Sequence, residues 1–249
     1  MIADAVGHSI LPGIVLAFLV SYSRNVGVML IGAGISALSA VWLIDWLQTR
    51  FELKPDAATG SVYSTFFASG IVLLSLFANN VDLDQDCVLY GELAYVPLQL
   101  FSSTFAIPKA VLSCGILLLI ISLFITIFFK PLVYTSFNSD FLSIKGFAVG
   151  SFQKLISSLV AITTVISFES VGCILIVNLF VVPPLIAMQL TSRVSHILLY
   201  ACAISGLCVV FGYIIALHLN VSITGVIATL SFGLLLTIWF CKSLYVKFA

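Results

Sequence analysis

Apolar runs of about twenty residues recur along this sequence and are separated by short polar connections. The hydrocarbon core of a bilayer is about 30 Å thick, and an α-helix crosses it in about 20 residues. Because backbone groups must be hydrogen-bonded inside that core, spans of this length are helices. The sequence therefore predicts an all-α, polytopic transmembrane bundle of about eight helices. The expected spans are residues 8–23, 26–47, 58–78, 110–130, 152–168, 171–190, 197–217 and 222–241.

Composition supports the same class of protein. Hydrophobic residues make up 61% of the chain and charged residues only 8%, whereas soluble domains carry about 25% charged residues. We expect residues 1–249 to form a single transmembrane domain. The net charge is zero, so no basic surface for a nucleic acid is indicated, and membrane lipid is the expected surrounding.

The charged residues predict which connections lie on which side of the membrane. Positive charges mark cytoplasmic ends, and they follow the second, fourth, sixth and eighth spans. An acidic cluster, Asp82 to Glu92, follows the third span and is expected outside. The apolar stretch 93–107 is short and flanked by prolines, so a partial or re-entrant helix is expected there. The cytoplasmic positive charges are Arg50, Lys54, Lys130, Lys145, Lys154, Arg193, Lys242 and Lys247.

Asp4 and His8 form a candidate functional pair at the start of the first apolar run. Residues four apart lie on one face of a helix, and ionisable residues within a membrane segment indicate function. Imidazole nitrogen and carboxylate oxygen together suit zinc, manganese or ferrous iron. The alternative is an aspartate favoured by the helix dipole beside an interfacial histidine. Asp45, Glu169, His196 and His218 are interpreted as solvated residues at span boundaries.

Two further segments stand out. Residues 135–147 predict a short amphipathic cytoplasmic helix that Asn138 or Ser139 could cap and Gly146 could end. Such a helix either docks a soluble partner or rests at the lipid interface. Pro183 and Pro184 lie within the sixth span, where proline removes a backbone donor and crowds the preceding turn. A kink is expected there, serving either as a gating element or as ordinary packing.

Four blocks of the sequence, taken in order, resemble the membrane permeases of bacterial ATP-binding-cassette importers for zinc, manganese and iron. The family's patterns are D-A-L-S-H-A-x-L-P-G, K-x-D-x-x-x-G with a later glycine, S-F-D with a closing glycine, and V-G-x-L-L followed by P-A-x-x-A-x-x-L-T. The matching segments here are Asp4 to Gly13, Lys54 to Gly60 with Gly70, Ser136-Phe137-Asn138 with Gly146, and Val171 to Thr191.

This resemblance implies a function as well as a fold. It implies a permease that alternates access for divalent metal ions, with Asp4 and His8 as metal ligands and no permanently bound cofactor. It implies that residues 135–147 are the coupling helix that contacts an ATPase. The implied partners are that ATPase subunit, a second permease copy or a paralogue, and an extracytoplasmic metal-binding protein. The coupling residues are Ser136, Phe137, Asn138 and Gly146.

Rival functions are less well supported by the sequence. A permease for a metal chelate such as a siderophore is the main alternative, but no aromatic or arginine cluster for an anionic chelate is evident. An intramembrane metalloprotease would need H-E-x-x-H, and an ATPase would need a G-x-x-x-x-G-K-[ST] loop. Neither motif occurs in the sequence. The chain is therefore not expected to be an enzyme.

The sequence also departs from the family pattern. Family members usually carry one more helix before the first block, whereas only three residues precede Asp4 here. We therefore expect that first helix to be missing from this chain. Asn138 stands where the family usually has an aspartate, and Gly7 stands where it has a serine. Neither difference removes an implied metal ligand.

Overall fold

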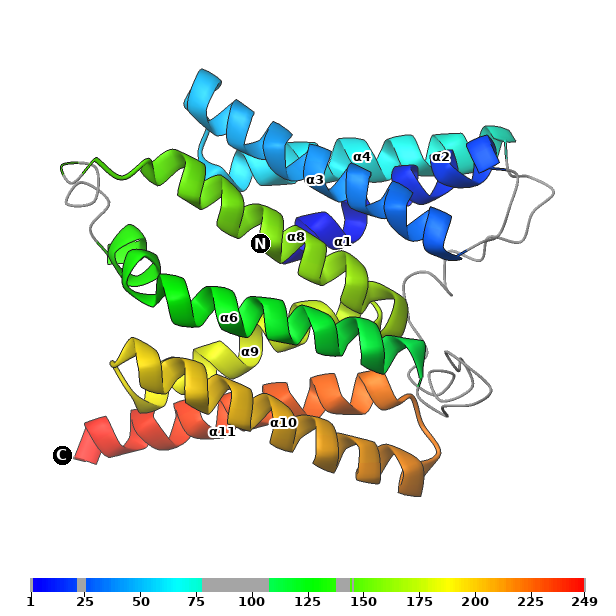
Figure 1. Ribbon diagram of the computed structural model, residues 1–249. Coiled ribbons are helices and arrows are strands. Elements are labelled where there is room, and N and C mark those ends of the chain that lie inside the picture. Colours follow the sequence, from blue (N-terminus) through cyan, green and yellow to red (C-terminus); the bar gives the residue numbers. More distant parts are fainter. Residues whose placement is uncertain (1, 22–25, 78–107, 138–143, 145, 249) are drawn as a thin grey trace. The chain divides into compact units, whose positions relative to one another are not determined.

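The computed structural model describes residues 2–21, 26–77, 108–137, 144 and 146–248 (Figure 1). The chain divides into two compact units. Within the described residues, the first unit contains α1, α2, α3, α4, α6 and α8, and the second contains α9, α10 and α11. The helices are α1 Ile2–Ser9, α2 Leu11–Ser21, α3 Val26–Phe51, α4 Pro55–Phe77, α6 Lys109–Phe137, α8 Val149–Val171, α9 Cys173–Leu190, α10 Val194–Leu219 and α11 Ile223–Phe248.

The predicted helical class is confirmed. In the described part of the chain, seven segments are long and apolar enough to cross a membrane, when α1 and α2 are counted together as Asp4–Ser21. The sixth expected span forms α9, whose apolar part, Ile174–Leu190, is shorter than the other seven. The fold is a polytopic helical bundle. The expected partial helix at 93–107 and the acidic cluster lie outside the described residues.

The first expected span, residues 8–23, is not one continuous helix. It begins earlier, and it is interrupted at Ile10 between α1 and α2. Pro12 explains the interruption, because it has no N–H to donate to the His8 carbonyl and its ring crowds that group. The Ser36 hydroxyl of α3 donates to the Ser9 carbonyl oxygen at 2.6 Å. The interruption is thus stabilised from a neighbouring helix.

The α2 and α3 helices approach each other through two glycines. A Cβ added at Gly13 would lie 2.5 Å from the Ser36 Cβ and still closer to the Gly32 carbonyl oxygen. A Cβ at Gly32 would meet Gly13 and the Ala17 Cβ in the same way. Small residues at helix crossings let membrane helices pack backbone against backbone. This contact fixes the position of α2 beside α3.

A small apolar core holds α1 against α3 and α4. Ala5 of α1 is buried with Ala40 and Ile44 of α3 and with Ala58 and Val62 of α4. Three of the five members of this core are alanines, so the three helices can lie close together. The core fixes the face that α1 turns toward the bundle. The partly buried residues around it are Leu47, Tyr63 and Phe66.

The α6 helix contains a break in its regular geometry at Phe128, where φ is −101° and ψ is 20°. Pro131 explains the break, because its ring and its missing N–H disturb the turn before it. The helix nevertheless continues to Phe137, seven residues beyond the expected end of the fourth span at residue 130. The expected amphipathic helix falls mostly on residues 138–143 and 145, which lie outside the described residues. That helix stays a prediction.

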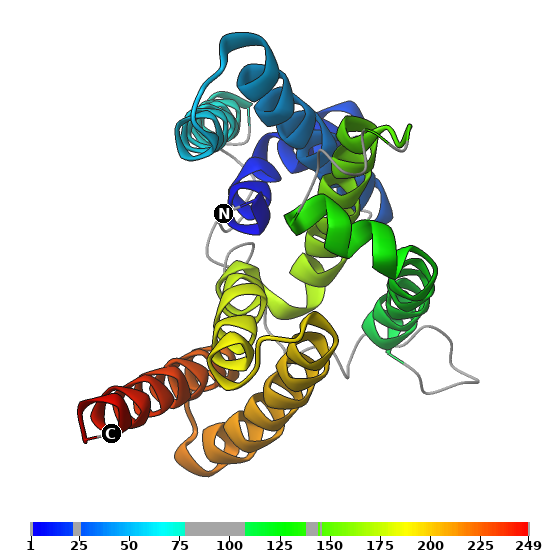
Figure 2. The same ribbon diagram turned by 90° about the vertical axis from the view of Figure 1, so that its left-hand side faces the viewer.

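The second unit is a three-helix arrangement in which α10 runs beside α9 and α11 (Figures 1 and 2). The Asn178 amide of α9 donates to the Ser231 hydroxyl of α11 at 2.7 Å, and that hydroxyl also lies 3.0 Å from the Asn178 Oδ1. Further along, the Lys242 ammonium donates to the Gln189 side-chain oxygen at 3.1 Å. Both pairs join residues 53 apart in the sequence. The α9 and α11 helices are therefore parallel, in a register set by two polar contacts.

Replacing Ser231 with alanine should destabilise the second unit. The Asn178 amide would lose its partner within the membrane, where an interhelical hydrogen bond contributes about 0.6–2 kcal/mol. We expect a lower unfolding temperature for the purified protein in detergent. Thr229→Ala is the matched control, because the Thr229 hydroxyl donates to carbonyls of its own helix. Equal unfolding temperatures for the two variants would contradict a stabilising role of the Asn178–Ser231 contact.

Candidate functional site

The structure brings Asp4 and His8 together on α1, as their spacing predicts. The Nε2 atom of His8 lies 3.7 Å from the Oδ1 atom of Asp4. The side chains are 31% and 48% exposed for His8 and Asp4 respectively. Two ligands bound to one tetrahedral zinc at about 2.0–2.1 Å lie about 3.3 Å apart. The observed separation is close to that value, so a small side-chain rotation would let both atoms contact one ion.

Two aromatic residues of α4 flank the imidazole of His8. The ring centroid of Tyr63 is 5.8 Å from that of His8, and the ring centroid of Phe67 is 5.5 Å away in an edge-on geometry. Tyr63 and Phe67 are four residues apart, so they lie on one face of α4. These two rings limit the orientations that the imidazole can adopt. They hold the ring beside Asp4 without supplying another nitrogen or carboxylate.

The rest of α1 fixes where the pair points. Ala5 and Ser9 are buried against neighbouring helices, and the Ser9 hydroxyl donates to the Ala5 carbonyl oxygen at 2.6 Å. Asp4 and His8 precede these two residues by one position each, so they lie at the edge of the buried face. Among the described residues, no group of three or more histidine, cysteine, aspartate or glutamate side chains lies together. The pair therefore offers two side-chain ligands.

The other residues singled out from the sequence lie elsewhere. Ser136 and Phe137 belong to the last turn of α6, where the Ser136 hydroxyl donates to the Leu132 carbonyl oxygen at 3.0 Å. Gly146 precedes α8 with φ of +76°, a conformation that favours glycine. Asn138 lies outside the described residues. The assignment of these residues to ATPase coupling stays a prediction.

Pro183 and Pro184 both lie inside α9, in the second unit. The helix runs from Cys173 to Leu190 through both prolines, and its C-terminal end is capped by the Thr191 N–H, which donates to the Ala187 carbonyl oxygen. Pro183 is buried and Pro184 is partly exposed. Their proposed gating role stays a prediction.

Sequence reasoning missed an ion pair between α3 and α8. The Lys154 ammonium lies 3.1 Å from the Oδ2 atom of Asp45, whose side chain is 33% exposed. The Lys154 side chain is 55% exposed, and Asp45 is a partly exposed residue that also has a specific partner in α8. Its position between two tryptophans in an apolar run was the available signal. His196 and His218, in contrast, are exposed at the two ends of α10, as expected.

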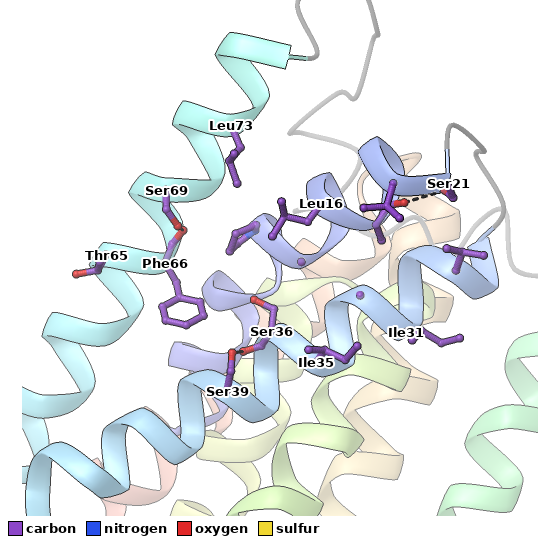
Figure 3. A pocket seen from close by; sticks show the side chains of 16 residues that line it. Leu16, Ser21, Ile31, Ile35, Ser36, Ser39, Thr65, Phe66, Ser69 and Leu73 are labelled. Atoms are coloured by element: carbon purple, nitrogen blue, oxygen red, sulfur yellow. Dashed lines mark hydrogen bonds between the residues drawn. The ribbon is translucent and has the colours of Figure 1, made fainter.

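A cavity of about 580 Å³ lies between α2, α3 and α4, separate from the Asp4–His8 pair (Figure 3). Most of its described lining is apolar. The hydroxyls of Ser39 and Ser69 line it as well, but each donates to a carbonyl of its own helix. None of the described lining residues is charged. The cavity therefore does not have the chemistry of a metal site.

The sequence matches a known family of transport proteins along most of its length. Residues 1–242 match the model of the ABC 3 transport family. The manganese transport system membrane protein MntD of Bacillus subtilis is 36% identical over 93% of this chain and 79% of its own length. The zinc transport system membrane protein TroD of Treponema pallidum is 32% identical over 93% of this chain, which spans only 63% of TroD.

A solved structure agrees with these sequence matches. PsaBC from Streptococcus pneumoniae, in complex with Fab, has a TM-score of 0.74 and 26% identity over 95% of this chain and 79% of that chain. The family match covers nearly the whole sequence, and the described residues form the helical bundle expected of a membrane permease. The sequence contains no phosphate-binding loop for ATP. The chain therefore belongs to the ABC 3 transport family, as a membrane permease subunit whose ATPase is a separate protein.

Proposed function

We propose that this chain is the transmembrane subunit of an ATP-driven importer that moves manganese or zinc ions across the bacterial cytoplasmic membrane. Relatives named for manganese and for zinc transport support these two metals. Neither relative is named for iron transport, so iron has less support than the sequence suggested. The names of these relatives also favour metal ions over a siderophore chelate as the transported substrate.

The observation that carries this proposal is the geometry of Asp4 and His8. One carboxylate oxygen and one imidazole nitrogen lie 3.7 Å apart on α1, and both atom types bind manganese and zinc. Two protein ligands hold an ion weakly, which suits transport because an ion in a pathway must also leave. Water or other protein groups complete the coordination. We assign Asp4 and His8 to a transient site in the path.

The transport cycle requires partners that supply energy and substrate. An ATPase subunit binds ATP and acts on the segment around residues 135–147, through Ser136, Phe137, Asn138 and Gly146. A second permease copy or a paralogue completes the path, and an extracytoplasmic metal-binding protein delivers the ion. Pro183 and Pro184 in α9 then allow the helix to bend as access alternates. No permanently bound cofactor is needed for this cycle.

Uptake by a reconstituted complex tests the proposal. Proteoliposomes would contain this chain, its ATPase and its permease partner, with the binding protein added outside. Radiolabelled manganese, zinc and ferrous iron would be supplied separately, beside a ferric siderophore. We expect ATP-dependent accumulation of manganese or zinc. Accumulation of the siderophore alone, or of none of these substrates, would contradict the proposed function.

A further inference from the structure

The two flanks of the proposed coupling segment are joined by an aromatic cluster, defined as Phe124, Phe128, Phe147 and Phe152. Phe152 of α8 is buried, and its ring centroid lies 6.2 Å from that of Phe124 and 5.9 Å from that of Phe128, both in α6. The ring centroid of Phe147, just before α8, lies 5.4 Å from that of Phe152 in an edge-on geometry. Because Phe128 is the residue at which α6 loses helical geometry, the cluster connects that break directly to the start of α8.

The α8 helix is in turn connected to α3 by two polar contacts. Lys154 and Asp45 form the ion pair at 3.1 Å, and the Trp42 indole N–H donates to the Ser158 hydroxyl at 3.4 Å. Moving forward along α3 from Trp42 to Asp45 corresponds to moving backward along α8 from Ser158 to Lys154. The two helices are therefore antiparallel at this point, and the contacts lie about one helical turn apart.

The packing around these polar contacts is incomplete. A cavity of about 60 Å³ lies beside Asp45 and is lined also by Val41, Ile44, Gln48 and Ser157. A void removes apolar contacts between the groups on either side of it. The ion pair and the indole hydrogen bond therefore carry a larger share of the mechanical connection between α3 and α8 than they would in a close-packed interface.

From α3, the contacts lead to the helix that carries Asp4 and His8. Ala40 and Ile44 of α3 pack with Ala5 of α1. Ile44 is the residue immediately before Asp45, so the ion pair and this core occupy the same turn of α3. About two turns closer to the start of α3, the Ser36 hydroxyl donates to the Ser9 carbonyl oxygen at 2.6 Å. A shift of α3 at Asp45 would thus be transmitted to α1 through two contacts, at Ala5 and at Ser9.

We propose that Asp45 and Lys154 are positioning residues that transmit movement of the coupling segment through α8 and α3 to the Asp4–His8 pair. This inference rests on the proposed function, because it assigns a route between the two ends of that cycle. The aromatic cluster moves with the coupling segment and carries α8 with it. The ion pair makes α3 follow α8, and the alanine-rich core makes α1 follow α3. Neither Asp45 nor Lys154 contacts the transported ion.

The test measures metal ions transported per ATP hydrolysed in the reconstituted complex. Asp45→Asn and Lys154→Met each remove one charge with little change in volume. We expect each to lower the transport ratio by about fivefold or more, the usual lower range for energetic coupling between sites. ATP hydrolysis should stay within about twofold of the unaltered complex, since the ATPase subunit itself is unchanged. Arg50→Met removes a positive charge from the exposed last turn of α3 and should leave the ratio unaltered.

A variant in which the two charges are exchanged shows whether transport depends on the ion pair itself or on the individual side chains. The double variant Asp45→Lys with Lys154→Asp keeps an ion pair, so we expect it to recover most of the lost transport ratio. Unchanged ratios in both single variants would overturn the inference. Failure of the reversed pair to recover, or loss of ATPase copurification in the single variants, would also overturn it. If the unaltered complex transports neither manganese nor zinc, it is the proposed function that fails.

Discussion

Metal uptake is expected to fall to background when either Asp4 or His8 is replaced with alanine, while the complex remains assembled. Each replacement leaves a single side-chain ligand of the pair, and one ligand cannot hold a divalent ion in the path against water. Asp4→Asn is the sharper variant, because it keeps the shape of the side chain and removes the negative charge. The measurement is initial uptake of radiolabelled manganese or zinc by proteoliposomes, with copurification of the ATPase as the assembly check.

Two other histidines provide matched controls for this prediction. His196 and His218 lie at the ends of α10 and are exposed, so their replacement with alanine removes the same chemical group outside the proposed site. We expect both variants to transport metal as the unaltered chain does. Normal uptake by the Asp4→Ala and His8→Ala variants would remove the pair from the transport path and leave the family membership unaffected.

Replacing Gly13 with valine is expected to prevent stable folding of the first unit. Its Cβ would come within 2.5 Å of the Ser36 Cβ and closer to the Gly32 backbone, and a backbone cannot move aside as a flexible side chain can. Overpacking typically costs about 1–3 kcal/mol, and we expect at least the upper end of that range here. Displacing Ser36 would also disturb its hydrogen bond to Ser9. The measurement is the yield and unfolding temperature of the protein in detergent.

Gly34 offers a control only two residues from Gly32 on the same helix. A Cβ added at Gly34 would meet nothing within 4 Å, so Gly34→Val changes the same residue type without a clash. We expect near-normal yield for this variant. Gly32→Val should match Gly13→Val, because the two glycines face each other. Similar stability of the Gly13 and Gly34 variants would contradict close packing of α2 on α3.

The helical class and most helix positions could be predicted from hydropathy alone. The pairing of Asp4 with His8 could also be predicted, because helical periodicity is a local property of the sequence. The breaks in helices were harder to place. Pro12 and Pro131 interrupt regular geometry near Ile10 and Phe128, while α9 runs as one helix through Pro183 and Pro184. The effect of a proline depends on what surrounding helices supply to the freed backbone groups.

Contacts between distant segments could not be predicted from local patterns. Lys154 and Asp45 each resemble an ordinary boundary charge, and only the packing of α8 beside α3 brings them together. The aromatic rings that flank His8 come from α4, and nothing in the spacing of Tyr63 and Phe67 indicates a histidine partner. The coupling helix and the single-domain organisation stay predictions from sequence and resemblance.

The α6 helix is longer than a bilayer core is thick, which bears on how movement of its C-terminal end reaches the membrane-spanning part. Its 29 residues correspond to a rod about 43 Å long at 1.5 Å per residue, which exceeds the bilayer core of about 30 Å. The part before Phe128 is about 29 Å long and matches the core, whereas the part after it adds about 13 Å. A stretch of core length that begins at Lys109 therefore ends near the break at Phe128. We therefore expect the part of α6 after Phe128 to extend beyond the hydrocarbon core. The break would let that part change its angle while the part before Phe128 keeps its tilt in the bilayer.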